Sequence, residues 1–422
     1  MVLLKKIKGG ALQYVLVISV IIAIIIFAFI SLIYLQRRTS IKHQFSKQTI
    51  ANTQLGLDYF KVKEVAYNQE INLDFLDNTE ALTTIVKKHW GVFDLAIVTS
   101  QIKNERFQKI GLLGTQNVKR DALYLKDNNQ SLVLVGKTKI TGSVSLPQQG
   151  VKSGNISGIS YSGNQLIYGN TKTSTSSLPK IKNIDYLKSI SKNYRDESYE
   201  NFELEDELKL HQSFSKNTLI YEDGNPIILS NISLNGNIMI VSKTAITVRP
   251  SAILENVILI APTITIESKT KGNFQAFATK NINIQSGCQL KYPTALVLLD
   301  EEKKEININQ KETEVYQIKI DKNNVIRGVI MYHSDSKSTN FKAQINVEEN
   351  VIITGELYCS KNIEMRGSVF GSVYTNNFIA NQSGRIYINH VYNGVINADK
   401  LPIQYSGLQI NQPSNSVVKW VD

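Results

Sequence analysis

The chain has 422 residues and a formal net charge of +11, and 42% of its residues are hydrophobic. This hydrophobic content excludes bulk disorder, and the length after any anchor predicts two or three domains. The excess positive charge is scattered without a run of five basic residues, so nucleic acid is not an expected partner. Two cysteines and five dispersed histidines form neither a disulfide framework nor a metal-ligand motif, so no cofactor is expected.

The N-terminus combines a short basic head, residues 1–10, with an uncharged apolar segment, residues 11–35. As a helix this segment would measure roughly 37 Å, enough to cross a hydrocarbon core about 30 Å thick. We therefore expect a single-pass transmembrane helix with the lipid bilayer as its partner. Basic residues flank the segment on both sides, so charge bias does not choose an orientation. A long C-terminal part can be exported whatever the charges that flank the helix, and we expect it to be periplasmic or otherwise extracytoplasmic.

Residues 36–65 keep helical character and predict a stalk helix that continues from the membrane segment. The pattern Lys8-Gly9-Gly10 before a long apolar helix resembles the N-terminus of type IV pilin-like proteins. The resemblance implies a helix half in the membrane and half packed on a β-domain, with cleavage after a glycine. Ala11 and Val15 stand where that family usually has Phe and Glu, so processing after Gly10 stays open.

Residues 66–170 are predicted to fold as a β-rich meander domain, because alternating β-branched segments are separated by polar turns. Residues 171–225 change composition: a Ser/Thr-rich linker precedes charged residues whose Leu and Phe spacing predicts one or two helices. A domain boundary is expected in this segment.

Residues 226–410 show a six-residue period that predicts a parallel β-solenoid with three strands per coil. Apolar or small residues recur along two tracks, which start at Ile240 and Val248 and include Ile258 and Ile260. The clearest triplets start at Ile246, Ile264 and Ile282, and the hexad returns in a new phase from Ile345. The polar segment 300–324 is predicted to be an insertion, and residues 411–422 a C-terminal tail. The predicted fold class is thus mainly β, with an N-terminal transmembrane and stalk helix, a meander (α+β) domain and a C-terminal solenoid.

Candidate chemistry in the solenoid is sparse. Some hexad solenoids are acyltransferases that use a histidine as the general base, and His333 and His390 are the only histidines in the predicted solenoid that could serve this role. A site like that of polysaccharide lyases would need a cluster of carboxylates beside Arg327, Lys361 and Arg366, but only Glu356 and Glu364 occur there. All five residues alternate with inward positions, so we expect them to face solvent. The acidic run Asp300, Glu301 and Glu302 is read as solvated, and Cys288 and Cys359 as buried thiols. We therefore predict no catalytic, cofactor-binding or metal-binding residues, and expect that the protein is not an enzyme.

Two further resemblances concern the β-structure. Gly-x-Φ-Tyr occurs at Gly355 and Gly371 and resembles bactofilins, β-helical proteins that polymerise end to end. The segments GKTKITGSVSLP and GNISGISYSGNQLIYGN resemble uncharacterised single-pass, β-rich envelope proteins of the Bacteroidota. Together these features predict a membrane-anchored structural or adhesive envelope protein, as a pilin-like surface-assembly component or a polymer-binding protein. Its partners would be other envelope proteins, a second copy or an extracellular glycan. A glycan-active solenoid enzyme and a membrane-tethered, bactofilin-like cytoplasmic scaffold remain as alternatives.

Overall fold

The computed structural model describes residues 10–75, 81–117, 119–195, 198–300, 316–336, 341–410 and 414–422. The fold is mainly β with one long N-terminal helix and a parallel β-solenoid, which confirms the predicted fold class. The chain forms two compact units, whose boundaries fall within the helix, directly before one strand and within three further strands. The first unit comprises Met1–Tyr59, Glu70–Ile85 and Val98–Gln108; the second comprises Phe60–Gln69, Val86–Ile97 and Lys109–Asp422.

The predicted transmembrane and stalk segments form one continuous helix, α1 (Gly10–Val62), which ends at Val62 and not at residue 65. No proline interrupts it, and every side chain from residue 12 to residue 35 is exposed. In the described part of the chain, α1 is the helix long and apolar enough to cross a membrane, with a mean hydropathy of 3.3 in its most apolar window.

The C-terminal half of α1 has a buried face in the first unit. Thr49, Thr53 and Leu57 are buried at a helical spacing of four residues, and Asn52, three residues after Thr49, is buried as well. At Gly56 a Cβ atom would lie 2.5 Å from the Val98 side chain, so glycine lets this turn approach the sheet closely. The helix therefore changes from exposed on all sides to packed on one face.

A five-stranded sheet has the order β1-β2-β3-β4-β31, and two-residue turns between β2, β3 and β4 make those pairs antiparallel. The segment expected to be a C-terminal tail is therefore largely a strand, β31, antiparallel to β4. The bounds are β1 (Glu70–Leu73), β2 (Ala81–Trp90), β3 (Phe93–Ile102), β4 (Glu105–Gln116) and β31 (Ser414–Val421).

The solenoid in the second unit has three strand faces, and each strand pairs in parallel with the equivalent strand of the next coil. The first face contains β13 (Glu200–Asn201), β15 (Leu219–Asp223), β18 (Ile238–Ser242), β5 (Leu123–Leu125), β8 (Val144–Leu146) and β12 (Thr171–Thr173). The second contains β16 (Ile227–Leu229), β19 (Ala245–Val248), β23 (Gln317–Ile320), β25 (Ile345–Val347), β29 (His390–Tyr392), β6 (Leu132–Val135) and β9 (Val151–Ser153). The third contains β14 (Lys209–Gln212), β17 (Ser233–Gly236), β30 (Val395–Asn397) and β7 (Lys139–Thr141).

Six long strands turn corners and contribute to more than one face. They are β20 (Ile253–Ile266), β21 (Lys271–Ile284), β22 (Gln289–Asp300), β24 (Val325–Ser334), β26 (Ile352–Met365) and β27 (Ser368–Gln382). Antiparallel additions are the hairpin β10 (Asn155–Ile156) and β11 (Ile159–Ser160), and β28 (Arg385–Ile388) on β27. The short helices are α2 (Ile184–Ser189) and η1 (Ala398–Lys400).

The predicted three-strand coil is confirmed by the strand register. Ile246 pairs with Ile264 and Ile264 with Ile282, so the triplets eighteen residues apart stack directly. All three side chains are fully buried in the lumen of the solenoid. The intervening Thr247, Thr265 and Asn283 face outward, as the Φ-x-Φ pattern requires.

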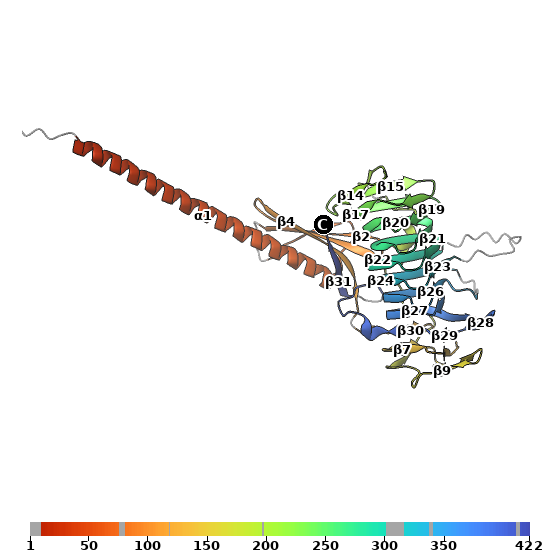
Figure 1. Cartoon of the computed structure of the whole chain (residues 1–422). Helices are drawn as coiled ribbons and strands as arrows, with labels where there is room; N and C mark the ends of the chain where they lie inside the picture. Colours follow the sequence, from red (N-terminus) through yellow and green to blue (C-terminus); the bar gives the residue numbers. More distant parts are fainter. Residues whose placement is uncertain are drawn as a thin grey trace, which may run out of the picture. The chain divides into compact units, whose positions relative to one another are not determined.

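The last coils of the solenoid are built from residues that precede the first coils in sequence. β5 pairs with β27, β7 with β30 and β6 with β29. Figure 1 shows this order: the coils run from β14 and β15 through β27 and β30, and the yellow strands β7 and β9 follow. The expected meander over residues 66–170 is thus limited to β1–β4. Residues 123–173 instead belong to the solenoid.

Two other boundaries differ from the expected ones. Segment 171–225 contains one short helix, α2, and its later part forms the strands β13–β15, so the solenoid begins before residue 226. Within the predicted insertion 300–324, β23 pairs with the end of β21 and completes a coil. Residues 301–315, including Glu301 and Glu302, lie outside the described residues.

Two cores lie on opposite sides of the first strand face. The lumen holds one, and the other covers the outer surface of the first face with Trp90, Val92 and Phe93. Ile258 and Ile260 belong to this outer core, so placing them inward was wrong. The strand register shifts by one residue between Glu255 and Val257, and again between Ala261 and Thr263. A shift of one residue turns the side chains between these two points to the opposite side of the strand.

A column of glycines lets neighbouring coils meet at one corner of the solenoid. Gly328, Gly355 and Gly371 are paired in register and have φ values of 142°, 147° and 151°. A Cβ atom at Gly355 would lie 1.9 Å from the Gly328 carbonyl oxygen. The glycine of each Gly-x-Φ-Tyr pattern is therefore required by the backbone geometry here.

Candidate functional site

The two solenoid histidines lie on different strands and have different surroundings. His333 on β24 has its Nε2 3.2 Å from Asp335 Oδ1, and Asp335 also pairs with Lys188. His390 on β29 bonds through Nδ1 to the Ile388 carbonyl oxygen at 2.7 Å. Burial lowers the pKa of both imidazoles, and the positive charge of Lys188 adds to this effect at His333.

The two cysteines are free and buried, as predicted. The Cys288 thiol lies 3.1 Å from the Glu267 carbonyl oxygen. Burial raises the pKa of Cys288, and it raises the pKa of Cys359 to about 12, so both thiols stay protonated at neutral pH. Within the described residues, no three His, Cys, Asp or Glu side chains gather into a group that could hold a metal ion.

Of the five charged residues expected to face solvent, Arg327 is exposed, and Lys361 and Arg366 are half-buried. The expectation was wrong for Glu356, which is 3% exposed. It was also wrong for Glu364, which is 9% exposed and bonds to Arg366 at 2.8 Å. Asp300 accepts a hydrogen bond from the Tyr332 hydroxyl at 2.7 Å.

Glu356 is buried because residues 405–408 cover the outer side of β26. The Leu408 amide donates to Glu356 Oε2 at 2.6 Å, and Arg120 Nε lies 4.0 Å from Oε1. The Tyr405 hydroxyl donates to the Gly328 carbonyl at 3.0 Å. Burial raises the pKa of Glu356 against the opposing charge of Arg120. These contacts hold the covering segment onto the solenoid, which is a structural role.

A second buried charge, Asp94 on β3, is surrounded by polar groups. Lys87 Nζ lies 3.0 Å from its carboxylate, and Tyr67 and Gln409 donate hydrogen bonds to it. His89 is stacked between Tyr67 and Tyr186, with ring centroids 3.7 and 3.9 Å away. Burial opposes ionisation of Asp94, but His89 and Lys87 outweigh it and lower its pKa. Apart from charged residues close to Trp90, the sequence carried no signal for this cluster.

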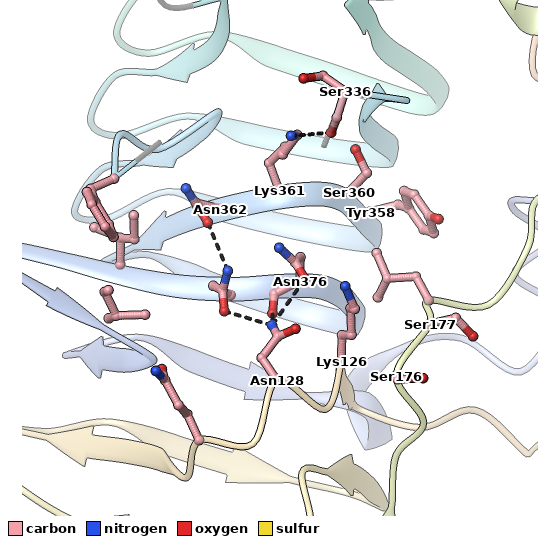
Figure 2. Close-up of a pocket in the computed structure, with 16 residues that line it drawn as sticks. Lys126, Asn128, Ser176, Ser177, Ser336, Tyr358, Ser360, Lys361, Asn362 and Asn376 are labelled. Carbon is pink, nitrogen blue, oxygen red and sulfur yellow. Dashed lines mark hydrogen bonds between the residues drawn. The ribbon is translucent and has the colours of Figure 1, made fainter. Parts of the chain in front are cut away.

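The described residues also form a groove of about 740 Å³ along one corner of the solenoid. Its lining is contributed by four successive coils, by the crossing segment 176–178 and by Phe341. Figure 2 shows the polar side chains of these coils one below another, from Ser336 to Asn128. The lining residues are Lys126, Asn128, Gln130, Ser176, Ser177, Leu178, Ser336, Phe341, Tyr358, Ser360, Lys361, Asn362, Asn376, Asn377, Ile379 and Ile388.

A column of asparagines forms the floor of this groove. Asn377 Nδ2 donates to Asn362 Oδ1 at 3.2 Å, and Asn128 Nδ2 donates to Asn377 Oδ1 at 2.9 Å. Asn128 also donates to the Asn376 carbonyl oxygen at 2.8 Å. The side-chain amides are thus fixed by one another. Asn128 and Asn376 are 248 residues apart in sequence, so sequence reasoning could not bring them together.

No family model matches the chain, and no curated protein matches it. Among solved structures, the chain is similar to the competence-associated pilin ComZ from Thermus thermophilus, with 11% sequence identity and a TM-score of 0.23. The likeness covers 92% of this chain and 94% of that chain. A TM-score at this level does not establish a shared fold.

Proposed function

We propose that the chain is a membrane-anchored, non-enzymatic surface component of the pilin-like kind, with a solenoid that binds an envelope partner or polymer. The observation that carries this proposal is the change in character along α1. Side chains 12–35 are exposed all round the helix and strongly apolar, whereas residues 49–57 have a packed face. A helix that is apolar on every side is stable where lipid surrounds it.

The ends of the solenoid favour this role over an end-to-end scaffold. Phe202, Leu204 and Leu208 pack against the lumen core from the coil that precedes β15, and Tyr161, Leu166 and Ile167 do so from the coil that follows β8. Both terminal coils are irregular and bring their own covering residues. A solenoid that stacks on further copies would instead present regular open strands at its ends.

The anchor can be tested by membrane flotation of the full-length protein and of two double variants. Ile24→Arg with Ile25→Arg places two charges in the apolar half, at a cost of about 5–7 kcal/mol for membrane insertion. Ile50→Arg with Leu55→Arg changes two similarly exposed residues of the packed half. We expect only the first pair to leave the membrane fraction, and equal flotation of both would contradict the anchor.

Orientation requires a separate measurement. Protease added to spheroplasts should digest the solenoid if it lies outside the cytoplasmic membrane. Protection until the membrane is lysed would support the cytoplasmic alternative.

A further inference from the structure

We propose that the corner groove binds an acidic oligosaccharide, a short stretch of a polysaccharide that carries uronate carboxylates. This inference deepens the proposed function and rests on it, because it names the class of polymer that the solenoid would recognise. The binding chemistry is argued from the groove alone.

The shape of the groove fits an extended repeating chain. Ser336, Ser360, Asn376 and Asn128 come from successive coils, so polar groups recur at the spacing of neighbouring strands. Three steps of about 4.8 Å give a run of roughly 14 Å along the solenoid axis. That length suits a short oligosaccharide whose sugar rings present hydroxyl groups at a regular interval.

The chemistry of the lining fits hydroxyl groups together with negative charge. Asparagine, glutamine and serine predominate, and the described lining holds two lysines and no aspartate or glutamate. Phe341 is 57% exposed and offers an apolar ring surface beside the polar floor. Amides and hydroxyls donate to and accept from sugar hydroxyls, while ammonium groups make charge-assisted bonds to carboxylates.

A nucleic-acid strand fits this lining less well. Binding of such a strand relies on several basic contacts to phosphates and on aromatic faces for stacking. The described lining supplies two basic side chains, and its other aromatic residue, Tyr358, is 4% exposed. The side-chain amides of the lining both donate and accept hydrogen bonds, whereas a phosphate backbone offers only acceptor oxygens.

The groove is organised before any ligand binds. Hydrogen bonds between side chains already fix Asn362, Asn377 and Asn128, so little side-chain freedom remains to be lost. Within the described part of the chain, the Lys126 ammonium and the Asn376 Nδ2 group have no partner, although both line the groove. These two donors are therefore assigned to the ligand carboxylate and to a ligand hydroxyl.

The test is isothermal titration calorimetry of the full chain in detergent with trigalacturonate, its methyl ester and a single-stranded thymidine oligonucleotide. We expect trigalacturonate to bind more tightly than its uncharged ester. Lys126→Gln should weaken trigalacturonate about tenfold, because one charge-assisted bond is lost, and should leave the ester unchanged. Asn376→Ala should weaken both sugars.

Lys271→Gln is the matched control, since it removes the same charge from an exposed position outside the lining. All variants should keep the melting temperature of the parent protein. Absence of sugar binding at millimolar concentration would overturn the proposal. Equal effects of Lys126→Gln and Lys271→Gln, or tighter binding of the oligonucleotide than of trigalacturonate, would do the same. Each result is independent of whether α1 anchors the chain in a membrane.

Discussion

Ile264→Asp tests the inward side of the solenoid most directly. Ile264 is fully buried between Ile246 and Ile282 in the lumen. Removing the isoleucine side chain costs about 2–5 kcal/mol, as in an Ile→Ala change. An unpaired carboxyl group in the same place adds roughly 2–5 kcal/mol even when it is protonated. The sum approaches the whole stability of a typical domain, about 5–15 kcal/mol.

Thr265→Asp is the matched comparison, one residue along the same strand. Thr265 points outward between Thr247 and Asn283, so the new carboxylate stays hydrated. Surface changes of this kind usually alter the free energy of unfolding by about 0.5 kcal/mol or less.

The assay is urea unfolding of the full chain in detergent, followed by tryptophan fluorescence. Of the two tryptophans, Trp90 is 3% exposed in the outer core and Trp420 is 45% exposed, so Trp90 should give most of the change. We expect a large loss for Ile264→Asp, an intermediate loss for Ile264→Ala and almost none for Thr265→Asp. Burial must raise the pKa of the introduced carboxyl above its usual value of about 3.9, so the loss in Ile264→Asp should shrink as the pH is lowered. Equal unfolding midpoints for Ile264→Asp and Thr265→Asp would refute the inward assignment.

Three further predictions concern the corner glycines, the buried carboxyl and the histidines. Gly355→Ala should lower the melting temperature strongly, because the added Cβ meets a carbonyl oxygen of the neighbouring coil, whereas Gly224→Ala, with nothing within 4 Å, should not. The raised pKa of Glu356 means that the folded state binds its proton more tightly than the unfolded state, so stability should fall as the pH rises above about 4.3; melting curves between pH 4 and 8 should show a smaller fall in Glu356→Gln. His333→Ala and His390→Ala should each fully complement any phenotype of a gene deletion, and a folded, normally abundant variant that fails to complement would favour an enzyme.

The six-residue period predicted the solenoid because it reflects one repeated local geometry. Each Φ-x-Φ unit specifies a strand with two inward side chains, and the eighteen-residue recurrence specifies the coil. The same reasoning failed at Ile258, where the strand is apolar on both sides. A continuous run such as Val257 to Ala261 indicates a strand buried on both faces, and this signal could have revealed the covered outer surface.

The groove, and the last coils of the solenoid built from residues 123–173, could not be predicted in the same way. Segment 123–173 has the alternation of apolar and polar residues that any strand-rich region shows. No local sequence pattern indicates that its strands pair in parallel with β27 and β30. The groove depends on that pairing, because Lys126 and Asn128 reach it only through β5. Glu356 was placed wrongly for a related reason: the segment that covers it, residues 405–408, follows it by about fifty positions.

The order of the coils has a consequence for biosynthesis. A ribosome releases β5, β6 and β7 before β27, β29 and β30, the strands on which they stack. These three strands must therefore wait with one unsatisfied edge while more than two hundred further residues are made. The remaining coils can form one after another from β13 towards β27, each on a finished neighbour. Joining the two parts closes a very long loop, which is a slow step in chains dominated by distant contacts. Truncation from the C-terminus should therefore leave the early segment unfolded and open to proteases, although it is the first part of the solenoid to be synthesised.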